Sequence, residues 1–284
     1  MRQMLFNGSA IRHAGLFLAI SLAALPVAGC KSLSFNDLTG SISRDEVPPN
    51  DPAGLRRFTE SWGKRYESNP NDRQVILVYA RGLRAEGKFS QAVAVLQQAA
   101  MRAPNDLEIL GAYGKALADA GRLDEAAGVL RQAHTADKPN WSIYSAQGSV
   151  ADQLGDHYGA QSFYVEALKL APGEPSVLSN LGLSYALNKE LSKAEEVLRQ
   201  AAKHPRADAR VRQNLALVLS LQGKFTEAET VASRDLSPDE AAANVAAIRQ
   251  MISQSNAWRE IQNSSTTQPA TPLAQAPMQM PAPR

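Results

Sequence analysis

The side chains with the widest chemical reach in this 284-residue sequence are its one cysteine, Cys30, and the three histidines that follow it, His134, His157 and His204. A thiol can be a nucleophile, a metal ligand or an acylation site, and an imidazole an acid, a base or a ligand. One cysteine excludes an intramolecular disulfide and a cysteine-based zinc site. No histidine pair has metal-ligand spacing, and no phosphate-binding loop, nucleophile elbow, zinc-protease motif or dinucleotide fingerprint occurs. We therefore expect no metal, no cofactor and no enzymatic activity.

Cys30 lies directly behind an export signal. Residues 1–13 carry two arginines and no acidic side chain. Residues 14–28 form an apolar run, which is shorter than the about 20 residues that a membrane-spanning helix needs. A basic start, a short apolar stretch and small residues after it are typical of a secretory signal peptide, which we expect at residues 1–29.

The residues Val27-Ala28-Gly29-Cys30 resemble the bacterial lipobox, although Leu is commoner than Val at its first position. In that motif the thiol is acylated and the peptide is cut before the cysteine. Two or three acyl chains anchor a protein firmly, because each buried methylene contributes about 0.8 kcal/mol. We expect lipidation of Cys30 and an outer-membrane lipoprotein that faces the periplasm, since Lys31 rather than Asp follows the cysteine. The alternative is ordinary cleavage near Ala28, which leaves a free thiol.

The charge balance excludes a dedicated nucleic-acid-binding surface. The chain has 30 Lys and Arg against 28 Asp and Glu, a formal charge of +2. Two of the arginines precede Cys30, so the 255 residues left after cleavage carry 28 basic and 28 acidic side chains. A phosphate-binding surface needs a clear excess of Lys and Arg. Together with the missing catalytic motifs, this predicts neither nucleic acid nor a small-molecule substrate among the partners.

A 34-residue repeat organises the rest of the chain. Gly87, Gly121, Gly155 and Gly223 are separated by 34, 34 and 68 residues, and Lys189 stands at the missing place in the series. Prolines recur at nearly the same step. Glycine ends one helix where a left-handed residue is wanted, and proline stops the next. The spacing predicts a helix, a tight turn, a second helix and a break in each unit.

Small residues mark fixed positions within these units. The units are counted from Arg73, Leu107, Trp141, Pro175 and Ala209. Position 20 is then alanine in all five: Ala92, Ala126, Ala160, Ala194 and Ala228. Small residues are needed where helix backbones approach closely. The pattern resembles the tetratricopeptide repeat, which implies an all-α, right-handed superhelical solenoid of about five helix-turn-helix units with capping helices.

Two residues depart from the repeat pattern. Lys189 in the glycine position would cost about 1–2 kcal/mol if it were left-handed. We expect Asn188, which tolerates that conformation better, to take the role. His157 stands at position 17, where the repeat places an aromatic or large apolar residue, so we interpret it as a packing residue rather than a ligand.

Composition sets the remaining boundaries. Residues 30–51 are polar with Pro48-Pro49, which indicates a lipidated N-terminus followed by a flexible linker. The expected order is then a capping helix at 52–69, repeats at 70–238, a C-terminal capping helix at 238–262 and a disordered Pro/Gln/Ala-rich tail at 263–284. Ser237, Pro238 and Glu240 have the spacing of an N-cap, a first helical proline and a capping box.

The first helix of each unit lines the concave surface of such a solenoid, with positions 5, 9, 12 and 13 directed toward it. Early units place basic residues there, with Asp119 among them, and late units place leucines. These residues are Arg81, Arg84, Lys115, Leu183, Leu187, Leu217 and Leu221. The pattern predicts a groove with a basic end and an apolar end, suited to an amphipathic helix or an extended peptide. The alternative is that the leucines pack against the next helix.

The order of lipobox, polar linker, repeats and terminal Ala-rich helix resembles the TadD family of tetratricopeptide-repeat lipoproteins of the tight-adherence (Flp) pilus assembly system. The helix expected from Ser237 to Met251, which contains AAANVAAIRQM, most carries this resemblance. The family implies a non-enzymatic, pilotin-like scaffold that binds the pilus secretin or other Tad components and reaches the membrane through its lipid anchor. The alternative is a general envelope adaptor for another pilus, polysaccharide export or outer-membrane assembly.

Overall fold

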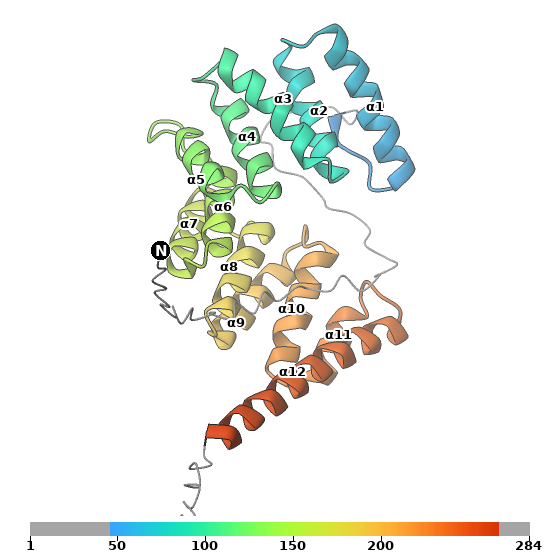
Figure 1. Cartoon of the computed structure of the whole chain (residues 1–284). Coiled ribbons are helices and arrows are strands. Elements are labelled where there is room, and N and C mark those ends of the chain that lie inside the picture. The colour runs from blue at the N-terminus through green and yellow to red at the C-terminus, as the bar shows by residue number, and fades with distance from the viewer. Residues whose placement is uncertain (1–45, 267–284) are drawn as a thin grey trace, which may run out of the picture. The chain divides into compact units, whose positions relative to one another are not determined.

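The computed structural model describes the backbone of residues 46–266 and the side chains of residues 46–254, and that part of the chain contains twelve helices and no strand (Figure 1). The helices are α1 Pro52–Ser68, α2 Arg73–Ala85, α3 Phe89–Arg102, α4 Leu107–Asp119, α5 Leu123–Gln132, α6 Trp141–Gln153, α7 His157–Leu170, α8 Pro175–Leu187, α9 Leu191–Lys203, α10 Ala209–Leu221, α11 Phe225–Ala232 and α12 Pro238–Thr266. None of these helices combines the length and apolar character needed to cross a bilayer. The predicted signal peptide, Cys30 and the end of the tail lie outside the described residues.

Each of the five repeat units begins with a polar cap. The residue before each first helix accepts a hydrogen bond from a backbone N–H of the first turn, which satisfies a donor that the helix itself leaves unpaired. These caps are Asp72, Asp106, Asn140, Glu174 and Asp208, spaced 34 residues apart. The same period that places the glycines therefore also places the helix starts.

Small residues at position 8 face a large side chain at position 24 of the same unit. A Cβ added to Gly114 would lie 2.6 Å from Cγ of Leu130, and one added to Gly182 would lie 2.6 Å from Cγ of Leu198. The five alanines at position 20 are fully buried. Complete burial of these alanines is what close packing of the two helices of a unit requires.

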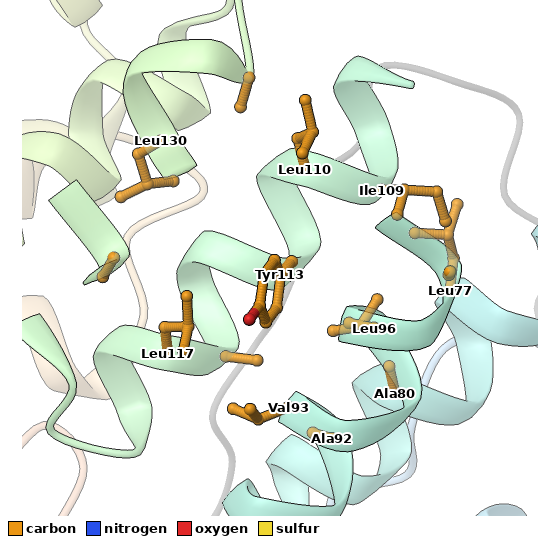
Figure 2. Close-up of a cluster of buried hydrophobic side chains, with 14 of the residues drawn as sticks. Leu77, Ala80, Ala92, Val93, Leu96, Ile109, Leu110, Tyr113, Leu117 and Leu130 are labelled. Atoms are coloured by element: carbon orange, nitrogen blue, oxygen red, sulfur yellow. The ribbon is translucent and has the colours of Figure 1, made fainter. Parts of the chain in front are cut away.

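Buried clusters bridge neighbouring units along the array. In the first part of the repeat array, buried side chains from α2 to α6 form a single cluster. Figure 2 shows Leu77 of α2, Leu96 of α3, Ile109 of α4 and Leu130 of α5 among its members. Each unit thus buries its apolar face against its neighbour, as a solenoid requires.

The array is closed by a helix at each end. Trp62 of α1 is 6% exposed and packs with Val75 and Val78 of α2. At the other end, the backbone N–H of Ser237 donates to Oε2 of Glu240 at 2.9 Å, and the Glu240 N–H donates back to Oγ of Ser237 at 3.4 Å. This is the predicted capping box. The helix that it starts, α12, continues to Thr266, four residues into the predicted tail.

The glycine series has one exception, and its conformation differs from the prediction. Gly87, Gly121, Gly155 and Gly223 all have positive φ. Lys189 takes their place with φ 65°, whereas Asn188 has φ −82° and caps α8 instead. The prediction that Asn188 is the left-handed residue is wrong, because the 34-residue register fixes which residue turns the chain.

Candidate protein-binding surface

The predicted basic residues share one face of the first helices, but their charges are engaged. Nε of Arg84 donates to Oδ2 of Asp119 at 2.6 Å, which joins α2 to α4. Nζ of Lys115 donates to the hydroxyl of Ser142, which joins α4 to α6. These contacts connect the first helices of adjacent units. At the basic end predicted from sequence, Arg84 is therefore paired with a carboxylate, and Lys115 donates to a hydroxyl of the next unit.

Arg81 contacts a segment that lies outside the repeats. Its Nη1 donates to the backbone carbonyl of Glu46 at 2.9 Å, and Pro48, two residues further on, is buried. Burial lowers the pKa of Arg81, because it disfavours the charged form, while the carboxyl groups of Glu46 and Glu108 act in the opposite direction. The last residues of the predicted flexible linker are therefore packed against α2.

The predicted apolar residues form a second part of the same face. Leu183 of α8 and Leu217 of α10 are half-buried. One turn further along these helices, Leu187 is 57% exposed and Leu221 is 41% exposed. Each of the two helices thus carries a leucine at position 9 and another at position 13 of its unit. We call this set of residues the apolar strip: Leu183, Leu187, Leu217 and Leu221. The alternative prediction, that all four leucines pack against the next helix, does not fit the exposure of Leu187 and Leu221.

The same helices carry a polar ladder, formed by Ser145, Asn180, Ser179 and Asn214, that was not predicted from the sequence. Nδ2 of Asn180 donates to Oγ of Ser145 at 3.4 Å, and Nδ2 of Asn214 donates to Oγ of Ser179 at 2.9 Å. Each bond joins position 6 of one unit to position 5 of the unit before it. The repeated Asn-after-Ser spacing of 35 residues was the signal that could have revealed this ladder.

A polar cluster around Asp152 superficially resembles a catalytic arrangement. The Asp152 carboxylate contacts Nδ1 of His157 at 2.9 Å and accepts hydrogen bonds from the hydroxyls of Ser184 at 2.8 Å and Tyr164 at 3.1 Å. The Ser184 hydroxyl donates to the carboxylate and not to the imidazole, and its residue is fully buried. A serine nucleophile needs a base and access to substrate. The cluster therefore has the geometry of an internal network that joins α6, α7 and α8.

The Asp152 cluster also explains two side chains of the third unit. Burial, followed by the nearby Asp152 charge, raises the pKa of the Tyr164 phenol well above its ordinary value, so the phenol remains a hydrogen-bond donor. His157, at the position where other units carry Phe or Leu, uses its ring nitrogen on the same carboxylate. His157 therefore makes a polar contact at the position where a packing residue was predicted.

Carboxylates on the second helices also pair rather than stand alone. Oε1 of Glu195 accepts from Nη2 of Arg199 at 2.7 Å, and Oε2 of Glu195 accepts from Nζ of Lys224 at 2.7 Å. Arg199 also donates to Glu227 at 2.6 Å, which links α9 to α11. Among the residues that the structure describes, no group of three or more His, Cys, Asp and Glu side chains could hold a metal ion.

Comparisons with known proteins agree with this architecture. Two family models, both described as tetratricopeptide repeat, match residues 83–146 and 145–209. No curated protein sequence matches the chain.

Among solved structures, a thermophilic tetratricopeptide-repeat protein of Thermus thermophilus is similar with a TM-score of 0.54 and 20% identity, over 59% of this chain and 91% of that one. The Cut9–Hcn1 hetero-tetramer of APC/C has a TM-score of 0.55 and 17% identity, over 68% of this chain and 40% of that chain. At these identities the likeness concerns the fold. The chain folds as an all-α tetratricopeptide-repeat superhelix, a fold that is typically a non-catalytic scaffold for protein partners.

Proposed function

We propose that this tetratricopeptide-repeat chain is an outer-membrane-anchored scaffold for assembly of the tight-adherence (Flp) pilus, acting like a pilotin on the pilus secretin. The observation that carries the proposal is the order of parts: a lipobox at Cys30, then repeats, then an Ala-rich terminal helix. The lipid anchor would hold the repeats at the membrane where a secretin is assembled. No step of this role requires catalysis.

The apolar strip is the surface that we assign to the partner. Leu187 and Leu221 are large, exposed and at equivalent positions of adjacent units, and Leu183 and Leu217 continue each row by one helical turn. An amphipathic helix presents its own apolar residues at intervals of three and four, which suits such rows. The polar ladder and the polar residues Arg84, Asp119 and Lys115 on earlier units would fix the orientation of that helix rather than supply most of the affinity.

The binding test exchanges exposed leucines for charge. Leu187→Asp/Leu221→Asp should weaken binding of the secretin at least about tenfold, because an aspartate in an apolar contact must be desolvated without a partner. The matched control is Met101→Asp/Val165→Asp, which charges two exposed apolar residues on the second helices α3 and α7. Binding is measured by calorimetry with variants whose far-UV melts equal that of the wild type. Undiminished affinity of the Leu187/Leu221 variant would remove the apolar strip from the interface.

The pilus assignment has its own test in cells. Deletion of the gene should abolish surface pili, and Cys30→Ser should release the protein from the membrane and reproduce the defect. The alternative, a general envelope adaptor for another pilus, polysaccharide export or outer-membrane assembly, predicts a different co-purifying partner and intact pili. Pilin, secretin and secretion-ATPase genes beside this one would support the pilus role.

A further inference from the structure

The chain places part of its own N-terminal segment on the face where the predicted partner-binding residues lie. The backbone carbonyl of Glu46 accepts from Nη1 of Arg81 at 2.9 Å. Glu46 and Val47 are half-buried and Pro48 is buried, whereas Pro49 and Asn50 are exposed. Within the part of the chain that the structure describes, the contact involves residues 46–48, which we call the docked segment.

The chemistry of this contact is that of peptide recognition. The guanidinium of Arg81 donates to a main-chain carbonyl, so this hydrogen bond recognises the peptide backbone and does not depend on a particular side chain. Pro48-Pro49 has no N–H to donate and favours an extended conformation, which lowers the entropy lost on docking. The charge of Arg81 is also balanced from this side, since the Glu46 carboxyl raises its pKa against the effect of burial.

Local structure holds the docked segment in place. Asp51 caps α1 through a 2.6 Å hydrogen bond from the backbone N–H of Gly54, so the cap of the first helix follows only three residues after Pro48. So short a connection keeps the local concentration of the docked segment at Arg81 in roughly the millimolar range, by the usual behaviour of short linkers. A free peptide of the same chemistry must compete with that concentration.

We propose that residues 46–48 are an intramolecular ligand of the α2 end of this face, and that an extended, proline-containing peptide is the class of partner segment that displaces them. The docked segment contacts Arg81 of α2, whereas Leu187 and Leu221 of the apolar strip belong to α8 and α10. The two surfaces are thus on different units. The inference rests on the proposed scaffold function only for the identity of the displacing partner, because docking itself is a property of the chain alone.

The first test follows cleavage of the bond between Glu46 and Val47 by a glutamyl endopeptidase, in the mature lipoprotein in detergent. A protease needs an extended, accessible segment, so docking should protect this bond. Arg81→Met removes the guanidinium but keeps an unbranched stem, and Pro48→Gly removes the buried ring from the other side. Arg81→Met should raise the cleavage rate about tenfold, the loss expected for a hydrogen bond to a charged group. Pro48→Gly should raise it about as much, because it removes the buried ring and loosens the backbone. Arg57→Met on an exposed position of α1 is the control and should leave the rate unchanged.

The second test adds a fluorescent peptide with the sequence of residues 45–51, DEVPPND, to two proteins. The opened variant Glu46→Gly/Val47→Ser/Pro48→Gly has a vacated site and should bind the peptide, whereas the wild type should bind at least about tenfold more weakly because its own segment competes. Adding Arg81→Met to the opened variant should abolish binding. Equal cleavage of wild type, Arg81→Met and Pro48→Gly overturns the docking. Equal binding to the wild type, or none to the opened variant, overturns the recognition. Neither result bears on the Leu187/Leu221 test of the scaffold function.

Discussion

A single methyl group at Gly148 tests the packing logic of the repeat. Gly148 lies in the interior of α6, opposite Tyr164 of α7. A Cβ at this position would lie 2.6 Å from Cε1, 2.8 Å from Cζ and 2.9 Å from Cδ1 of the Tyr164 ring. The ring is fully buried, and its hydroxyl is tied to Asp152 at 3.1 Å, so it has little freedom to move away. Gly148→Ala therefore forces the two helices apart or displaces the ring.

Two opposing effects set the magnitude. Alanine in a helix interior is favoured over glycine by about 0.5–1 kcal/mol. Overpacking a close contact costs about 1–3 kcal/mol. We expect the free energy of unfolding of Gly148→Ala to fall by about 1 kcal/mol. Gly128 in the interior of α5 is the matched control, because a Cβ there has no heavy atom within 4 Å, and Gly128→Ala should gain the helix preference alone.

The assay is urea unfolding followed by far-UV circular dichroism, with both variants compared with the wild type. The two alanine variants should differ by about 2 kcal/mol, with Gly128→Ala above the wild type and Gly148→Ala below it. If Gly148→Ala is as stable as Gly128→Ala, the close approach of α6 and α7 is not what keeps position 8 small, and the reasoning fails.

Three further changes probe single features of the structure. Lys189→Gly should raise the free energy of unfolding by about 1 kcal/mol, because it removes a side chain from a left-handed turn; a loss of stability in urea melts would contradict this. Tyr164→Phe should lower it by about 1–2 kcal/mol, since Asp152 loses a buried donor, and a calorimetric melting temperature equal to that of the wild type would refute the role of the hydroxyl. Burial raises the pKa of Glu195, but hydrogen bonds from Lys224 and its other partners outweigh burial and hold that pKa below the ordinary value of a glutamate. Because the folded pKa is lowered, this stabilisation is present above the unfolded value and is lost as the pH falls through the folded one. Glu195→Gln should therefore reduce stability at about pH 7 and flatten its decline from about pH 5 to 3, and an identical decline in both proteins would exclude the effect.

The repeat units could be predicted because their signals are local. A turn of positive φ favours glycine, as at Gly87, Gly121, Gly155 and Gly223, and close helix packing favours a small residue at each position 20. The capping box at Ser237 is likewise a contact between residues three apart. Such constraints act within one turn or one helix pair, so they repeat visibly in the sequence.

The binding face was predicted only in part. Repeat position alone identified Leu187 and Leu221, and their exposure agrees with a surface role. Arg84 was assigned to the same face, but its pairing with Asp119 depends on the neighbouring unit, 35 residues away. The position of a side chain in the repeat therefore indicates which surface it faces, but it does not indicate which residue of a neighbouring unit it contacts.

The sequence by itself determined the period, the start of each unit and the small residues, because these follow from backbone conformation and from contacts inside one unit. Only the tertiary structure decided that Lys189 rather than Asn188 turns the chain, that Asp152 gathers three side chains around its carboxylate, and that Arg81 holds the chain's own segment at Glu46. The turn at Lys189 follows the 34-residue register against the residue's own preference, whereas the contacts of Asp152 and Arg81 bring together groups that the 34-residue pattern does not relate. Long-range packing and desolvation select such contacts, and neither leaves a periodic trace.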